Sequence, residues 1–133
     1  MNIQAPSLLI TDDDQAFRET LEGVFVPRGY RTLLAGDGEE ALSIVRREEV
    51  HLLLVDMHMP KLTGLETLRR VKQVKSILPC ILLSAHLDEL IIEQARLAQA
   101  FSVLSKPITV HQITQIVRQA LERTYNWTQN RES

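Results

Sequence analysis

Cysteine, glycine and long apolar runs are all scarce in this 133-residue sequence, which holds one cysteine, Cys80, and five glycines. A lone cysteine cannot form an internal disulfide, and the apolar run CILLS that it begins is typical of a buried structural thiol. The first ten residues lack the basic start and the apolar length of a signal peptide, and no run approaches the length of a membrane span. We therefore expect a cytoplasmic protein.

An excess of charge of one sign is missing too. Fifteen lysines and arginines stand against 17 aspartates and glutamates, for a formal net charge of −2. This balance offers no basic field for nucleic acid and no basic amphipathic stretch for a membrane surface. No glycine-rich phosphate loop follows the first apolar run; aspartates stand there, and they would repel phosphates unless a metal ion intervened. Nucleic acid, membrane and nucleotide are thus disfavoured as partners of this domain.

The sequence does contain a regular alternation of short apolar runs with helical segments. The apolar runs lie at residues 7–11, 30–35, 51–55, 80–84 and 101–105. The segments after them carry apolar residues at helical spacing, most clearly Ile113, Val117 and Leu121, and Thr109 with Gln112 has capping-box spacing just before that stripe. Strand followed by helix, five times over, predicts one α/β domain with a five-stranded parallel sheet covered by helices on both faces.

Polar side chains gather where the predicted strands end. Asp12 and Asp13 follow the first run, and Asp56 follows the third. Ser84 closes the fourth run, and Lys106 follows the fifth. Because the carboxyl ends of parallel strands share one edge of the sheet, we expect these side chains to converge. Three carboxylates suit Mg²⁺, a cation beside a lysine suits a phosphoryl group, and a carboxylate can act as nucleophile to give an aspartyl-phosphate.

Four motifs in order carry a resemblance to a known family. They read TDDD at 11–14, VDMHMPKLTG at 55–64, LLSA at 82–85 and SKP at 105–107. Their key residues are separated by 43 positions (Asp13 to Asp56), 28 (Asp56 to Ser84) and 22 (Ser84 to Lys106). In these residues the chain resembles the receiver domain of two-component response regulators, from residue 7 to about residue 123. The resemblance implies a flavodoxin-like (βα)5 fold and a part in phosphorelay signal transduction.

The resemblance also implies roles for the acidic residues. Asp56 is the implied phosphoacceptor, which takes a phosphoryl group from a sensor histidine kinase or a phosphotransfer protein. Asp13 and Asp56 would bind Mg²⁺ through their side chains, with the backbone carbonyl of His58 as a third protein ligand. Asp12 would act mainly through a metal-bound water. We expect the remaining aspartate, Asp14, to cap the helix that follows.

The same resemblance assigns the hydroxyl and the ammonium. Ser84 would hydrogen-bond the new phosphoryl group, Lys106 would pair with it, and the peptide bond before Pro107 would be cis. His58 and His86 each lie two residues beyond a site residue, which allows two interpretations: a transition-metal site, or side chains that tune how fast the phosphoryl group is lost. The second is favoured because the spacing of the two histidines follows from the loops and not from ligand geometry.

Two positions depart from the family pattern. The aromatic residue usual three positions before the lysine is Val103 here, and the usual Gly-Ala pair before the fifth strand reads Gln99-Ala100. Phe101 has the same parity as Val103, which predicts that both lie on one face of the sheet. The residues that would carry the chemistry are all present. The aromatic side chain that, in the family, swings inward when the hydroxyl residue moves is absent. A non-switching, pseudo-receiver-like interaction module therefore stays open as an alternative to a phosphorylation-controlled switch.

The domain organisation follows from the extent of the resemblance. We expect a receiver domain over residues 1–124 and a polar, frayed tail or linker start over residues 125–133. Such a domain would catalyse only its own phosphorylation and dephosphorylation, and homodimerisation through the fourth and fifth helices is a further implication of the resemblance. A Mg²⁺-dependent phosphohydrolase is a weaker hypothesis, because position 58 is not acidic and no cap domain is present.

Overall fold

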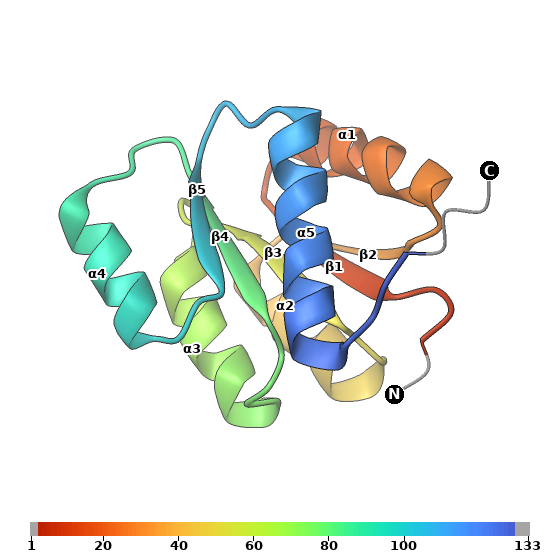
Figure 1. Ribbon diagram of the computed structural model, residues 1–133. Helices are drawn as coiled ribbons and strands as arrows, with labels where there is room; N and C mark the ends of the chain where they lie inside the picture. Colours follow the sequence, from red (N-terminus) through yellow and green to blue (C-terminus); the bar gives the residue numbers. More distant parts are fainter. Residues whose placement is uncertain (1–2, 130–133) are drawn as a thin grey trace.

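Every strand of the sheet runs parallel to its neighbours, as the alternation of apolar runs and helical segments predicts (Figure 1). The structure is a computed structural model that describes residues 3–129. Within these residues the elements are β1 (Ser7–Thr11), α1 (Gln15–Phe25), the 3₁₀-helix η1 (Val26–Arg28), β2 (Arg31–Ala35), α2 (Gly38–Arg47), β3 (Leu52–Asp56), α3 (Gly64–Val74), β4 (Cys80–Ser84), α4 (Glu89–Leu97), β5 (Ser102–Ser105) and α5 (Val110–Tyr125).

The strand order decides where a ligand can bind. The order is β2-β1-β3-β4-β5, so the chain leaves β1 on one side and returns on its other side. This is the flavodoxin-like order, and the predicted fold is confirmed. In such sheets ligands bind beyond the carboxyl ends of the strands at the switch point, which here lies between β1 and β3.

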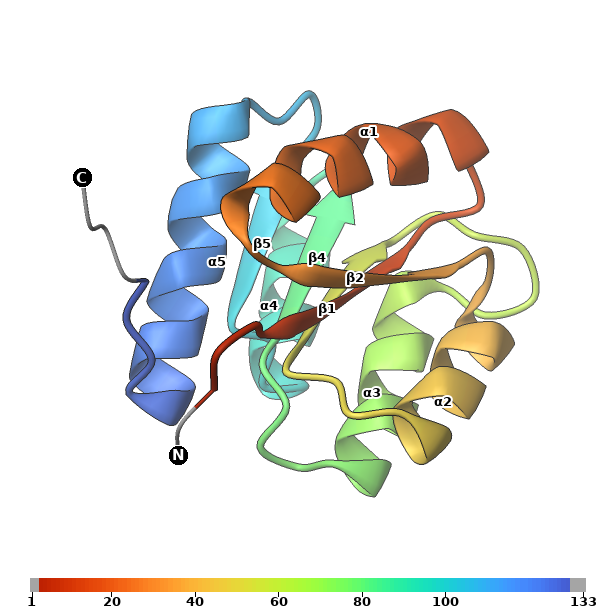
Figure 2. The same ribbon diagram turned by 90° about the vertical axis from the view of Figure 1, so that its right-hand side faces the viewer.

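Helices cover the sheet on both faces (Figure 2). Each face has its own hydrophobic core. Helices α1 and α5 pack on one face, against alternate strand residues such as Ile10 and Leu54. Helices α2, α3 and α4 pack on the other, against residues such as Leu9 and Leu53. Strands covered on both faces have no solvent side, and for this reason their sequences are apolar without alternation.

The single cysteine belongs to the second of these cores. Cys80 is fully buried, and burial raises the pKa of its thiol to about 12. The thiol therefore stays protonated and unreactive at neutral pH, because the thiolate is the nucleophilic form. The predicted structural role of this residue is confirmed.

The helices begin where their capping residues predict. The Asp14 side chain accepts hydrogen bonds from the first turn of α1, so its predicted role as N-cap is confirmed. Thr109 and Gln112 form the predicted capping box at α5, and Thr63 with Glu66 forms another at α3. In the described part of the chain no helix is both long enough and apolar enough to cross a membrane.

The loop after Asp56 closes tightly on Gly64, the first residue of α3. The Gly64 amide donates to the Met57 carbonyl at 2.9 Å. A Cβ at Gly64 would lie 2.8 Å from both the Asp56 carbonyl carbon and the Met57 Cα, which is too close for backbone atoms. Glycine thus allows α3 to start directly against the end of β3.

Gly64→Ala is expected to destabilise the domain by about 3 kcal/mol, because backbone must move to admit the methyl group. Gly23→Ala is the matched control. It lies on the exposed side of α1 with no heavy atom within 4 Å of the added Cβ, and it should stabilise by about 0.5–1 kcal/mol through helix propensity. Urea unfolding followed by circular dichroism measures both. Similar changes in the two variants would contradict the close approach at Gly64.

The end of the described chain packs back on the domain. The Trp127 ring lies 5.7 Å from the Tyr30 ring, and its Nε1 donates to the Ile3 carbonyl at 2.8 Å. The side-chain amide of Gln129 donates from Nε2 to the Arg28 carbonyl at 2.9 Å. The expected fraying is therefore wrong through residue 129, because the indole finds apolar surface that the polar sequence around it does not reveal. Residues 130–133, the rest of that segment, lie outside the described residues.

Candidate functional site

The side chains that we expect at the carboxyl edge of the sheet lie close together in the structure. Asp12 and Asp13 follow β1, and Asp56 is the last residue of β3, so they flank the switch point. One carboxylate oxygen from each of these three residues lies within 4.8 Å of the other two. We call Asp12, Asp13 and Asp56 the acidic cluster. Among residues 3–129 it is the only group of three or more histidine, cysteine, aspartate or glutamate side chains close enough to share a cation.

Lys106 neutralises part of the acidic cluster. Its Nζ lies 2.9 Å from Asp12 Oδ2 and 2.9 Å from Asp56 Oδ1. Partial burial acts to lower the pKa of the ammonium, but the hydrogen bonds and charges of Asp56 and Asp12 outweigh it and hold that pKa above its ordinary value. The lysine is therefore fully charged at neutral pH. The Lys106–Pro107 peptide bond is cis, as the resemblance implies.

The three carboxylates differ in their exposure. The side chains of Asp12 and Asp56 are 2% and 7% exposed, whereas Asp13 is open to solvent. Burial is the largest influence on Asp12 and raises the pKa of its carboxyl; the Asp14 amide, which donates at 2.9 Å, and Lys106 oppose this rise. The single positive charge of Lys106 does not neutralise the two buried carboxylates of Asp12 and Asp56. A cation that enters from the Asp13 side would compensate the remaining negative charge.

The donor set at this edge fits magnesium. Carboxylate oxygens are hard ligands, and Mg²⁺ takes few protein carboxylates while it keeps several waters. The exposed side of the cluster, at Asp13, leaves room for such waters. The imidazoles of His58 and His86 do not belong to the acidic cluster, so the transition-metal interpretation of the two histidines has no support in the described residues.

Ser84 lies between the two histidines. Its hydroxyl is fully buried, accepts a hydrogen bond from the His86 amide at 3.2 Å, and lies 3.3 Å from His58 Nε2. The centroids of the two imidazole rings are 5.6 Å apart, and both residues are exposed. Both histidines therefore lie on the exposed side of Ser84, with the His58 ring in reach of its hydroxyl.

Two residues of α1 complete the site, and the sequence did not point to them. The Phe17 ring centroid lies 4.0 Å from Lys106 Nζ, and Arg18 Nη1 donates to the Asp12 carbonyl at 2.6 Å. Phe17 belongs to the apolar stripe of its helix, and a stripe predicts only core packing. Phe17 and Arg18 lie about one helical turn after the aspartates, and this position was the only hint in the sequence that they could reach the site. A position on a helix does not reveal a contact with a residue as distant in sequence as Lys106.

The β5 region corrects one expectation. Val103 packs against the core under α2, α3 and α4, whereas Phe101 packs against the core under α1 and α5. The prediction that both share a face is wrong, because β5 begins at Ser102 and the alternation of side chains holds only within a strand. Gln99, where the family usually has glycine, has φ of 65°, in the left-handed region that favours glycine.

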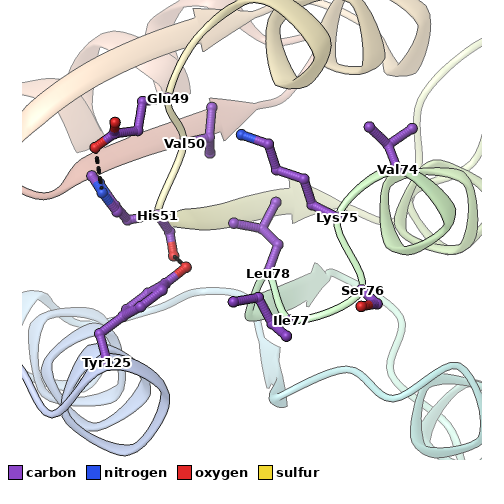
Figure 3. A pocket seen from close by; sticks show the side chains of 9 residues that line it. All are labelled: Glu49, Val50, His51, Val74, Lys75, Ser76, Ile77, Leu78 and Tyr125. Carbon is purple, nitrogen blue, oxygen red and sulfur yellow. Dashed lines mark hydrogen bonds and ion pairs between the residues drawn. The ribbon is translucent and has the colours of Figure 1, made fainter. Parts of the chain in front are cut away.

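A cavity of about 460 Å³ opens at the opposite edge of the sheet (Figure 3). On one of its walls, His51 Nδ1 accepts from the Ser7 amide at 2.9 Å, and Nε2 faces Glu49 at 2.9 Å. The Tyr125 hydroxyl donates to the His51 carbonyl at 2.8 Å, and burial raises the pKa of this phenol to about 12. These polar groups hold the ends of β1, β3 and α5 together. The wall is structural and lies apart from the acidic cluster.

Comparisons with known proteins agree with this geometry. Residues 8–118 match the family described as the response regulator receiver domain. The chain is 32% identical over 114 residues to sporulation initiation phosphotransferase F of Bacillus subtilis, with 86% of this chain and 92% of that protein covered. It is 37% identical over 118 residues to the response regulator MprA of Mycobacterium leprae; this match covers 88% of the chain but spans only about half (51%) of that longer protein.

A solved structure shows the same fold. The response regulator receiver domain protein (CheY-like) of Methanospirillum hungatei superposes with a TM-score of 0.89 at 20% identity, over 92% of this chain and 98% of that one. The strand order, the family match over most of the chain and the 32% identity across nearly all of the Bacillus protein lead to one conclusion. The chain belongs to the family of response regulator receiver domains of two-component systems.

Proposed function

We propose that this domain is a phosphorylation-controlled receiver in which Asp56 accepts a phosphoryl group from a sensor histidine kinase or a phosphotransfer protein. The observation that carries the proposal is the position of Lys106 Nζ, 2.9 Å from Asp56 Oδ1 and 2.9 Å from Asp12 Oδ2. A charged lysine beside a buried carboxylate, with Asp13 open to solvent on the same edge, suits a site that receives a dianionic group.

In the proposed transfer, an Asp56 carboxylate oxygen forms a bond to phosphorus while the nitrogen–phosphorus bond of a phosphohistidine donor breaks. The electron pair of that bond stays on the leaving imidazole nitrogen, which takes up a proton from solvent water. Lys106 keeps its proton and neutralises charge on the transferred group. Mg²⁺, when bound to the side chains of Asp13 and Asp56 and the carbonyl of His58, would balance the charge of the phosphoryl oxygens, with Asp12 contacting it through water.

Ser84 completes the proposed acceptor site. Its hydroxyl accepts a hydrogen bond from the His86 amide and lies 3.3 Å from His58 Nε2, and it can turn its own hydrogen toward another acceptor. We propose that this hydrogen is donated to the phosphoryl group on Asp56. The hydroxyl and Lys106 would then contact different oxygens of the group, because Ser84 ends β4 and Lys106 follows β5.

One observation keeps a second function in view. Val103 stands in β5 where the family usually has an aromatic residue that moves on phosphorylation. Phe101 lies on the other face of the sheet, so its ring does not replace that residue. A pseudo-receiver-like interaction module would bind its partners without regard to phosphate. The domain limits (1–124 and 125–133), a cytoplasmic location and homodimerisation through α4 and α5 stay predictions.

Mass spectrometry after incubation with acetyl phosphate and Mg²⁺ tests the proposal. We expect a gain of one phosphoryl group in the parent domain that disappears when EDTA replaces Mg²⁺. Mg²⁺ alone should also raise the melting temperature of the parent and not that of the Asp13→Asn variant, in which a neutral amide replaces the exposed carboxylate. No adduct, together with no beryllofluoride binding, would favour the interaction module.

The two histidines should set the lifetime of the phosphoryl group. His58→Ala is expected to speed its hydrolysis by about tenfold, because water can then reach the group beside Ser84. This factor corresponds to the loss of about one hydrogen bond's worth of free energy. His86→Ala should act in the same direction, whereas His111→Ala, an exposed histidine of α5, serves as control. Loss of phosphate from the isolated phosphoprotein is followed by mass spectrometry. Equal rates in all variants would refute this role.

A further inference from the structure

The Lys106 ammonium has neighbours of two kinds. Two are the carboxylates of Asp12 and Asp56, each at 2.9 Å. The third is the face of the Phe17 ring, whose centroid lies 4.0 Å from Nζ. An ammonium within about 6 Å of a ring centroid is attracted by the electron-rich face of the ring. In the described residues the other cation over a ring is Arg123 over Phe101, at 5.8 Å and remote from the acidic cluster.

The Phe17 ring is held in place from both sides. Its backbone amide donates to Asp14 Oδ1 at 3.3 Å, which ties it to the capped first turn of α1. Its side chain is half-buried and packs against the core between α1, α5 and the sheet. A ring anchored in this way is a fixed surface, whereas a lysine side chain is flexible and loses conformational freedom when it is held.

We propose that Phe17 is a positioning residue for Lys106. The ring covers one side of the ammonium, excludes water from it, and holds it within hydrogen-bond distance of Asp56 Oδ1. Because an anion bound at Asp56 must meet the ammonium there, the ring keeps Lys106 where the anion needs it. This inference rests in part on the proposed function, since it concerns the affinity of the same site for an anion.

The proposal separates the ring face from simple packing through two substitutions. Phe17→Leu keeps an apolar but smaller side chain and removes the π-face. Phe17→Tyr keeps the π-face and adds only a hydroxyl at the para position. Phe17→Tyr should match the parent in both roles, because tyrosine keeps the ring. A packing role predicts that Phe17→Leu loses stability but keeps its affinity for an anion at Asp56, whereas a positioning role predicts that this affinity falls.

The first measurement concerns the contact itself and needs no phosphate. In NMR spectra of the parent domain, the Lys106 Cε protons should be shifted upfield by the Phe17 ring. Phe17→Leu should remove this shift and Phe17→Tyr should retain it, with otherwise native spectra in both. An unchanged Lys106 shift in Phe17→Leu would overturn the inference, whatever the domain does with phosphate.

The second measurement is the affinity for beryllofluoride with Mg²⁺, by titration. Phe17→Leu should bind it about fivefold more weakly than the parent, a factor set by the strength of one cation–π contact, and Phe17→Tyr should match the parent. Equal weakening in both variants, or none in either, would overturn the inference. A parent domain that fails to bind beryllofluoride would refute the proposed function instead, and the Lys106 shift alone would then decide on Phe17.

Discussion

Asp56→Asn is expected to abolish the Mg²⁺-dependent gain of a phosphoryl group from acetyl phosphate. The amide has nearly the size and shape of the carboxylate, but it lacks the nucleophilic oxygen and the negative charge. Asp56 is buried and contacts Lys106 at 2.9 Å, and it is the one member of the acidic cluster that ends β3, the central strand of the sheet. Intact-mass measurement after incubation with and without Mg²⁺ reports the result directly.

Asp14→Asn is the matched control for this experiment. It makes the same chemical change two residues from Asp12, at an exposed N-cap that lies outside the acidic cluster. Asparagine is as good an N-cap as aspartate, so this variant should fold like the parent and gain the phosphoryl group as the parent does. A full phosphoryl gain in Asp56→Asn would show that another residue is the acceptor. A loss in Asp14→Asn would show that the assay reports folding instead.

Lys106→Met is expected to destabilise the Mg²⁺-free domain by about 3 kcal/mol, because it leaves two buried carboxylates without their cation. Mg²⁺ should restore more stability to this variant than it adds to the parent, since it would replace a missing charge. Lys106 also lowers the pKa of Asp12, so its removal raises that pKa further above its ordinary range. Urea unfolding at several pH values, with and without Mg²⁺, measures these effects.

The sign of the pH dependence follows from Asp12. A carboxyl whose pKa is raised by folding binds more protons in the folded state than in the unfolded state, so stability falls as pH rises from its ordinary pKa through the raised one. The penalty of Lys106→Met should therefore be largest at neutral pH and shrink on acidification. Lys72→Met, on α3 and remote from the acidic cluster, should show no such dependence. A penalty that is independent of pH and Mg²⁺ would mean that Lys106 acts through packing alone.

The sequence by itself determined the sheet, its helices and the composition of the acidic cluster. Helical and strand periodicity depend on neighbours within a few residues, so they can be read from a short window. The caps at Asp14 and Thr109 are local for the same reason. Asp12, Asp56 and Lys106 are far apart in sequence, but each stands at a strand end, and a parallel sheet brings strand ends to one edge. That rule predicts that the three side chains converge, although no distance between them can be read from the sequence.

Only the tertiary structure decided which groups touch. The ring of Phe17 meets Lys106, Trp127 packs on Tyr30, and Phe101 turns away from Val103. Each outcome depends on how separate elements approach one another, or on the residue at which a strand begins. Those relations arise from packing across the whole chain, and no periodicity within a single segment encodes them.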